Sequence, residues 1–334
     1  FRIVWRIGLV ATALVLGWKV VSVNMADHML GRYYDGDGEA LELAMAWDEN
    51  HPKAQALQGS RLLKRGQKEE AEAYLASAVV NNPADAWPLM LLADQRRQEG
   101  KQEIADQMVE TADRLRPVDP QIQRLLAVHW YKSGQLDKAI LHLSRVLSTS
   151  PGERKDMYPI VLQIAEHTET RQTLRPLAED PPVWWESFFA YAMRNSKNID
   201  SLRALVAMRK NSRIPVSDYE RNAYISRLKK DGYIAEAYLL WVSGLDKPER
   251  EALAYLYDGN FELDFSNSGF GWYANPPKRS GIVVSRGKTY DVSGERALYL
   301  SFRGKRQRFN HLRQNLFLNP GNYQLTGRVR VDKL

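Results

Sequence analysis

Three stretches of this 334-residue chain share one pattern: Gly59–Pro83 reads GSRLLKRGQKEEAEAYLASAVVNNP, Ala93–Pro117 reads ADQRRQEGKQEIADQMVETADRLRP, and Ala127–Pro151 reads AVHWYKSGQLDKAILHLSRVLSTSP. Each stretch begins 34 residues after the previous one and ends in proline. Glycine and alanine recur at fixed places between, as Gly66, Gly100 and Gly134, and as Ala71, Ala105 and Ala139. A 34-residue period with this punctuation predicts a solenoid of helical hairpins.

The residue types in this pattern have physical reasons. Glycine adopts the left-handed conformation that ends a first helix, alanine lets an antiparallel helix approach closely, and proline stops the second helix. The pattern resembles tetratricopeptide repeats, with full repeats over Pro52–Pro83, Pro83–Pro117 and Pro117–Pro151. Ala40–Trp47 is predicted to be the second helix of a partial repeat before them.

Individual positions carry the resemblance further. Small residues occupy one matching place in the three first helices, as Gly59, Ala93 and Ala127, and the large Leu62 and Trp130 occupy another. Arg96 stands in the place of Leu62 and Trp130, so we expect a local distortion in that repeat.

Residues 152–256 keep a helical composition but lose the strict period. Pro182–Arg194 and Asp200–Lys210 are predicted to form a helix pair, and Ser217–Val242 another repeat-like hairpin with Gly232 at its turn. Trp184, Trp185, Phe188 and Phe189 are expected in the core of this part.

The N-terminal part is strongly apolar. Ile7–Val23 contains one charge, Lys19, and follows Arg2 and Arg6. As a helix it reaches about 25 Å, near the lower limit for crossing a bilayer. We interpret it as an uncleaved anchor whose Lys19 extends toward the headgroups, with Trp5 and Trp18 in the two interfacial belts. A cleaved signal peptide and a buried core helix are the alternatives.

Composition narrows the remaining possibilities. The 44% apolar content excludes general disorder, and the absence of cysteine excludes disulfides and thiolate metal sites. Residues 257–334 hold 13 Lys or Arg against 6 Asp or Glu, an excess equal to the whole chain's net charge of +7. The basic character therefore belongs to the C-terminal part.

The residue pattern of this C-terminal part is typical of a β domain. Ile282–Ser285, Ala297–Phe302, Asn315–Leu318 and Tyr323–Val331 are predicted strands, the last two joined by a turn at 319–322. The order of short motifs, DGNFE at 258–262, FGW at 270–272, SG at 293–294 and PGNYQL at 320–325, resembles the carbohydrate-binding-module type of jelly roll, also called galactose-binding-like. That fold needs about eight strands. We therefore expect the sandwich in this sequence to be incomplete.

The resemblance implies saccharide binding by exposed aromatic side chains, here Trp272 and Tyr273; the alternative for Trp272 is that it fills the sandwich core. A basic cluster formed by Arg303, Lys305, Arg306, Arg308 and Arg313 fits an anionic polysaccharide, acidic lipid headgroups or an acidic partner, or simply a solvated strand edge. Asp258 and Glu262 resemble the carboxylates that hold a structural calcium in some family members.

The concave face of the solenoid offers a second candidate surface. Its predicted lining is Trp87, Met90, Asp94 and Arg97 from one repeat and Arg124, Val128 and Tyr131 from the next. Aromatic and arginine side chains supply much of the energy of protein recognition, so these residues suit a groove for a peptide or a partner's helix. The alternative is that Trp87 and Tyr131 pack against neighbouring helices.

No catalytic motif of a zinc protease, serine hydrolase, P-loop or dinucleotide enzyme is found, and the chain is expected not to be an enzyme. The predicted fold is mainly α: an anchor in 1–30, repeats in 31–151, divergent helical repeats in 152–256 and a β-sandwich in 257–334. The positive-inside rule places the bulk of the chain outside the cytoplasm, in the periplasm of a bacterium, where nucleic acid is no partner.

This architecture resembles membrane-tethered repeat proteins of bacterial exopolysaccharide assembly. It implies a single-pass inner-membrane scaffold that recruits a polysaccharide polymerase, ligase or exporter and touches an anionic polymer. Two other interpretations stand beside it: a periplasmic polysaccharide-modifying enzyme with its site beyond residue 334, and an envelope or secretion adaptor that binds no sugar.

Overall fold

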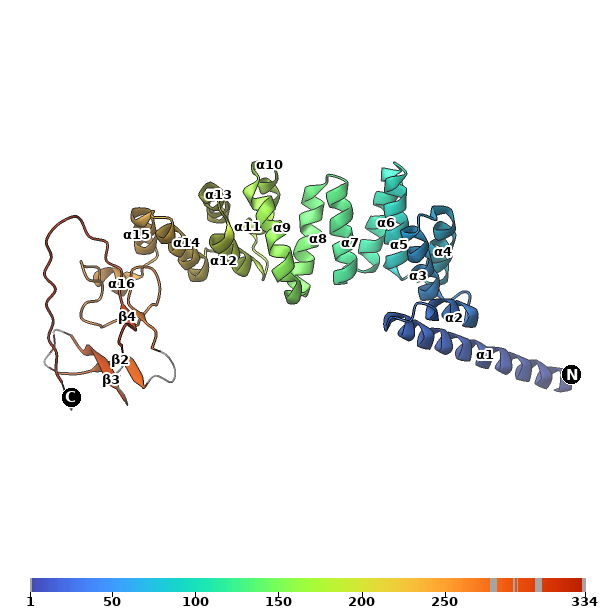
Figure 1. Cartoon of the computed structure of the whole chain (residues 1–334), viewed down its shortest axis with the longest axis horizontal. Coiled ribbons are helices and arrows are strands. Elements are labelled where there is room, and N and C mark those ends of the chain that lie inside the picture. The colour runs from blue at the N-terminus through green and yellow to red at the C-terminus, as the bar shows by residue number, and fades with distance from the viewer. Residues whose placement is uncertain (1, 277–280, 291, 293, 304–307, 332–334) are drawn as a thin grey trace. The chain divides into compact units, whose positions relative to one another are not determined.

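The computed structural model describes residues 2–276, 281–290, 292, 294–303 and 308–331. The chain divides into two compact units, Phe1–Ile164 with Glu169–Leu174, and Ala165–Thr168 with Arg175–Leu334. Helices dominate both units, and the described strands lie near the C-terminus (Figure 1).

The first unit is a series of helical hairpins. Its helices are α1 (Arg2–Tyr34), α2 (Ala40–Trp47), α3 (Pro52–Lys64), α4 (Lys68–Asn81), α5 (Ala86–Gln98), α6 (Gln102–Leu115), α7 (Pro120–Lys132), α8 (Leu136–Thr149), the short 3₁₀ helix η1 (Pro151–Glu153) and most of α9 (Arg154–Glu166). Within the repeats α3 packs on α4, α5 on α6 and α7 on α8, while α3 contacts α5 and α5 contacts α7 across repeats. The predicted repeats and the helix at Ala40–Trp47 are confirmed.

The three in-phase glycines end the first helices as the sequence indicates. Gly66, Gly100 and Gly134 have φ values of 80°, 79° and 73°. In the first turn the N–H of Gly66 donates to the carbonyl of Leu63, and that of Gln67 to Leu62, the pairing of a Schellman motif. The glycines therefore set the reversal between the helices of each hairpin.

The interior of the repeats uses the small residues that the pattern places there. Ala71 and Ala105 are fully buried, and Ala139 nearly so. A Cβ atom at Gly59 would lie 2.6 Å from Cγ of Leu75, so only glycine allows α3 to approach α4 this closely. Leu62 and Trp130 are buried at the place reserved for large residues.

The distortion expected at Arg96 is wrong. Helix α5 has the same length of 13 residues as α3 and α7. The guanidinium of Arg96 forms ion pairs with Glu72 of the preceding hairpin and with Glu99. The two carboxylates neutralise the charge of Arg96 at the edge of the core, so the repeat keeps its geometry.

Helix α1 has two halves with different surroundings. Leu9, Leu14 and Val15 are exposed in the first half, whereas Ala26 and Leu30 in the second half are buried. The buried half packs against α2 in a cluster with Leu41, Ala44 and Ala54. The second half of α1 therefore acts as the first helix of the partial repeat, and the predicted anchor boundary at residue 30 falls inside one continuous helix.

The second unit contains shorter helices. They are α11 (Arg175–Glu179), α12 (Trp185–Asn195), α13 (Ile199–Lys210), α14 (Asp218–Lys230), α15 (Ile234–Ser243) and α16 (Lys247–Glu251). Of the two short elements before them, η2 (Gln172–Leu174) and all but the first residue of α10 (Thr168–Arg171) belong to the first unit. The predicted hairpin at Ser217–Val242 is confirmed as α14 and α15. The predicted pairing of α12 with α13 is wrong, because α12 packs mainly on α14 and α13 on α11.

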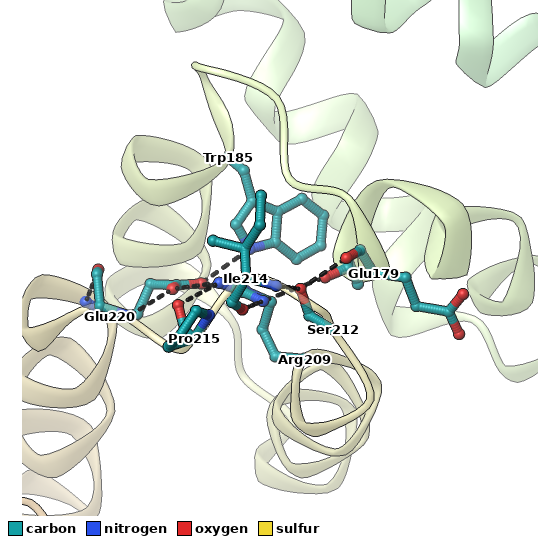
Figure 2. A network of polar contacts seen from close by, with 9 residues as sticks. Glu179, Trp185, Arg209, Ser212, Ile214, Pro215 and Glu220 are labelled. Carbon is teal, nitrogen blue, oxygen red and sulfur yellow. Dashed lines mark hydrogen bonds and ion pairs between the residues drawn. The ribbon is translucent and has the colours of Figure 1, made fainter.

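A buried polar network explains this exchange of partners (Figure 2). Both carboxylate oxygens of Glu220 on α14 accept from the guanidinium of Arg209 on α13, at 2.8 and 3.0 Å, and both side chains are almost fully buried. The indole N–H of Trp185 on α12 also donates to Glu220, at 3.0 Å. Glu220 thus ties α12 and α13 to α14, while Trp184, Phe188 and Phe189 fill the adjoining core as expected.

The C-terminal part contains two small antiparallel pairings. Strand β2 (Ile282–Lys288) pairs with β3 (Arg296–Phe302), and β1 (Tyr273–Ala274) pairs with β4 (Leu312–Arg313). The strands predicted at Asn315–Leu318 and Tyr323–Val331 are wrong, since no ladder hydrogen bonds form there among the described residues and Leu325 and Val329 are exposed. Strand propensity alone does not make a strand without a partner edge.

Aromatic side chains hold this part against α15. The ring centroid of Tyr238 lies 5.2 Å from that of Phe270 and 4.9 Å from that of Phe317, and Trp241 lies 5.0 Å from Tyr257. The C-terminal part and the α14–α15 hairpin therefore share one core.

We predict that Gly100→Ala lowers the free energy of unfolding by about 1–2 kcal/mol, because alanine is strained at positive φ. Nothing lies within 4 Å of the added Cβ, so the loss measures backbone strain alone. Chemical denaturation of the full chain gives the measurement. Gly152→Ala is the matched control, with open space and no positive φ; an equal loss in both variants would contradict the explanation.

Candidate binding surfaces

The predicted groove residues on α5 divide into core and surface. Met90 is buried in the cluster formed by α5 to α8, and Trp87 packs against the same cluster. Asp94 and Arg97 lie one turn apart nearer the C-terminus of α5 and form an ion pair of 2.7 Å. Trp87 and Met90 therefore stabilise the repeats, whereas the side chains of Asp94 and Arg97 are partly exposed.

An interaction between repeats links Asp94 to α7. The ammonium of Lys132 lies 3.6 Å from Oδ1 of Asp94, which also accepts from Arg97. Partial burial acts to raise the pKa of Asp94, but hydrogen bonds from Arg97 and Gln98 and the charge of Lys132 bring it below its usual range. Sequence reasoning missed Lys132, although its separation of 38 residues from Asp94, one repeat plus one helical turn, was a usable signal.

Helix α7 supplies the apolar part of this surface. Tyr131 is 66% exposed and Val128, one turn earlier, is 43% exposed, so neither packs into the repeat core. Arg124, at the other end of the helix, forms an ion pair of 2.6 Å with Glu153. Tyr131 and Val128, bordered by the pair of Asp94 and Lys132, form what we call the α7 patch, a surface suited to protein recognition.

A second polar network, largely buried, joins two repeats through α6, α7 and α8. Nδ1 of His142 on α8 lies 2.8 Å from Oε1 of Gln123 on α7, and Nε2 of Gln123 donates to Asp113 on α6 at 2.8 Å. Arg145 donates to the same carboxylate at 2.8 Å. Burial lowers the pKa of His142 from 6.5 to about 4; the cations Arg145 and Lys138 act in the same direction, against Asp113.

Asp258 and Glu262, the pair predicted to hold calcium, accept hydrogen bonds from backbone N–H groups. The buried carboxylate of Asp258 accepts from the N–H groups of Glu262 and Leu263, at 2.8 and 3.1 Å, and burial raises its pKa despite these bonds. Oε1 of Glu262 accepts from the N–H groups of Glu295 and Arg296, at 2.9 and 3.0 Å. Across the described ranges no three His, Asp or Glu side chains gather as metal ligands. Calcium binding stays a prediction.

The two aromatic residues predicted to contact a glycan, Trp272 and Tyr273, have different surroundings. Trp272 is partly buried, its indole N–H donates to the carbonyl of Asp258 at 3.1 Å, and its ring lies 5.0 Å from that of Phe261. Tyr273 and Arg313 lie opposite each other in the β1–β4 pairing.

The rest of the predicted basic cluster is described only in part. Arg303 and Arg308 are exposed, and the remaining two predicted contacts, Lys305 and Arg306, lie outside the described residues. Of the predicted anion contacts, the described structure brings Tyr273 and Arg313 together.

Comparison with known proteins identifies no family. No protein-family model matches the chain, and no curated protein matches its sequence. Among solved structures, the human IFIT1 dimer with PPP-AAAA is similar at 14% identity and a TM-score of 0.33, over 60% of this chain and 56% of that one. The chain thus matches little more than half the length of that structure. The repeat assignment rests on the glycine turns and helix packing of the chain itself.

We predict that the protein loses stability as the pH falls from about 6.5 toward 4, because the unfolded chain protonates His142 there and the folded chain does not. The loss is on the order of 2–3 kcal/mol. His142→Gln should flatten this part of the profile in denaturation experiments at pH 5 and 7.5. His28→Gln, at an exposed histidine, should keep the wild-type profile; identical profiles for all three proteins would exclude this role of His142.

Proposed function

We propose that this chain is a membrane-anchored scaffold of the bacterial envelope, with the first half of α1 in the inner membrane and the repeats in the periplasm. The single observation that supports it best is the contrast within α1, an exposed apolar half continuous with a half buried in the first repeat. An apolar helix surface of this length without protein cover suits a bilayer.

The alternatives for this segment fit less well. A signal peptidase cut near Val23 would divide one helix and separate its apolar half from Ala26 and Leu30, which fill the first repeat. A core helix would bury residues such as Leu9, Leu14 and Val15, and these are exposed. An uncleaved anchor agrees with both observations.

The contacts of α1 with α2 suggest where the membrane ends. Both carboxylate oxygens of Asp48, at the end of α2, accept from the ammonium of Lys19 at 2.9 Å, so Lys19 is held by protein as well as being near the interface. The rings of Trp18 and Trp47 lie 6.2 Å apart. We place the membrane interface at these two tryptophans, which leaves no linker between the anchor and the first repeat.

The repeats would then present the α7 patch to a protein partner, for which we propose an integral-membrane polymerase, ligase or exporter of exopolysaccharide. A tether raises the local concentration of such a surface at the membrane, so modest contacts suffice. We also propose that the β1–β4 and β2–β3 pairings belong to a jelly-roll sandwich that contacts the polymer; their antiparallel pairing supports this assignment.

The anchor is tested by Leu14→Asp in the full chain. A carboxylate in the middle of a spanning helix costs about 3 kcal/mol of insertion free energy, so the protein should shift from the alkali-resistant membrane fraction to the soluble or aggregated one. Val80→Asp changes an equally apolar, exposed residue on α4 and should leave the protein in the membrane. Soluble wild-type protein would refute the anchor.

The scaffold is tested by a photoreactive amino acid at Tyr131 in native membranes. We expect covalent capture of an integral-membrane protein from this position and from Val128, but not from Val80, which is exposed on the second helix of an earlier hairpin. Arg97→Glu should weaken the capture severalfold, since it reverses a charge at the edge of the α7 patch. Equal capture from Val80 would remove the α7 patch as the recognition surface.

A further inference from the structure

The C-terminal part and α14 together hold two cations over one aromatic ring. Lys229 lies in the last turn of α14, Tyr273 in β1, and Arg313 directly opposite Tyr273 in β4. The ring centroid of Tyr273 lies 5.6 Å from Nζ of Lys229 and 5.3 Å from Cζ of Arg313. Residues distant in sequence by more than 80 positions thus converge at one place.

Neither cation is neutralised there. Within the described part of the chain, no Asp or Glu forms an ion pair with Lys229 or Arg313, and the guanidinium of Arg313 makes no hydrogen bond. Three arginines on the helices of this unit have carboxylate partners: Arg203 pairs with Glu236, Arg209 with Glu220 and Arg227 with Asp231. The two cations around Tyr273 have no such partner among the described residues.

The surroundings fix Lys229 in this position. Its ammonium donates to the carbonyl of Gly269 at 2.7 Å, and the hydroxyl of Tyr273 donates to the same oxygen at 3.2 Å. Gly269 has a φ of 56°, and a Cβ there would lie 2.2 Å from the ring of Trp241. The ammonium also lies 4.9 Å from the ring centroid of Phe270, so one ammonium hydrogen is used by the carbonyl of Gly269 while the rest of the group lies beside two aromatic rings.

This arrangement has an electrostatic cost in the unliganded protein. Burial and the charge of Arg313 both lower the pKa of Lys229 below its usual range. A bound anion would offset both effects, because it adds opposite charge where like charges meet in a partly buried place. The site is therefore better suited to an anion than to water alone.

We propose that Lys229, Tyr273 and Arg313 form a binding site for the carboxylate of an acidic saccharide, a uronate. The planar fork of Arg313 matches the two oxygens of a carboxylate, Lys229 adds a point charge, and the ring of Tyr273, carried by β1, lies beside both cations. The choice of a saccharide rests on the proposed envelope function; the choice of an anion rests on the two uncompensated cations.

The test measures the affinity of the full chain in detergent micelles for a glucuronate tetrasaccharide by calorimetry. Lys229→Gln and Arg313→Gln should each weaken binding by about tenfold or more, the usual loss for one charge-assisted hydrogen bond. Lys230→Gln removes the same charge from the neighbouring, exposed residue of α14 and should change affinity by less than about twofold. The affinities for a neutral glucose tetrasaccharide and for inorganic phosphate are measured in the same way for comparison.

A purely structural role of Lys229 and Arg313 would give a different result in a measurement of melting temperature. If the two cations form an anion site, Arg313→Gln should keep or raise the melting temperature of the unliganded protein, because it removes a positive charge that acts on Lys229. A lowered melting temperature with unchanged uronate affinity would overturn the site. So would absence of uronate binding by folded wild-type protein, equal binding of the neutral sugar, or phosphate binding as tight as uronate. None of these results bears on membrane extraction, which tests the anchor separately.

Discussion

The repeats depend on one constraint, which is that a helical hairpin buries its apolar face only against the next hairpin. The left-handed glycines make each reversal, and the buried alanines bring neighbouring helices close enough to share a core. Helix α2 packs against the second half of α1, which therefore belongs to the same stack of helices. Because Ala26 and Leu30 of α1 complete the pocket for Leu41 and Ala44, the helix that we propose as the anchor is also a structural part of the repeat domain.

Buried polar groups decide which helices become neighbours where the period is lost. In the second unit Glu220 accepts from Arg209 and Trp185, and the two charges are sealed from solvent. Removing one partner from such a pair leaves a buried charge and typically costs about 3–5 kcal/mol, so alternative helix pairings that break it are strongly disfavoured. The network of Asp113, Gln123 and His142 acts similarly between two regular repeats. Specific polar contacts thus support the helix pairing in the regular repeats and set it in the second unit, where the regular spacing is lost.

Charge is distributed differently over the candidate binding surfaces. On the α7 patch Arg97 and Lys132 both pair with Asp94, so each cation has a carboxylate partner, which favours a partner recognised by apolar contact from Tyr131 with a polar border. Around Tyr273 the charges of Lys229 and Arg313 are not balanced by described residues, which favours an anion. Both surfaces are compatible with a tethered scaffold that holds a protein partner and a polymer near the membrane.

The sequence by itself determined whatever depends on local rules. The glycine turns, the helix pairs over Pro52–Pro151, the apolar helix and the two strands at 282–285 and 297–302 follow from backbone conformation and short-range periodicity. Tertiary structure decided what depends on distant partners. It showed that Met90 is core, that Arg96 is accommodated by Glu72, that α12 packs on α14, and that 315–318 and 323–331 have no strand partner among the residues that the structure describes. It also brought Lys229 to Tyr273 and Arg313. Such contacts are set by the packing of segments far apart in the chain, and no local pattern encodes them.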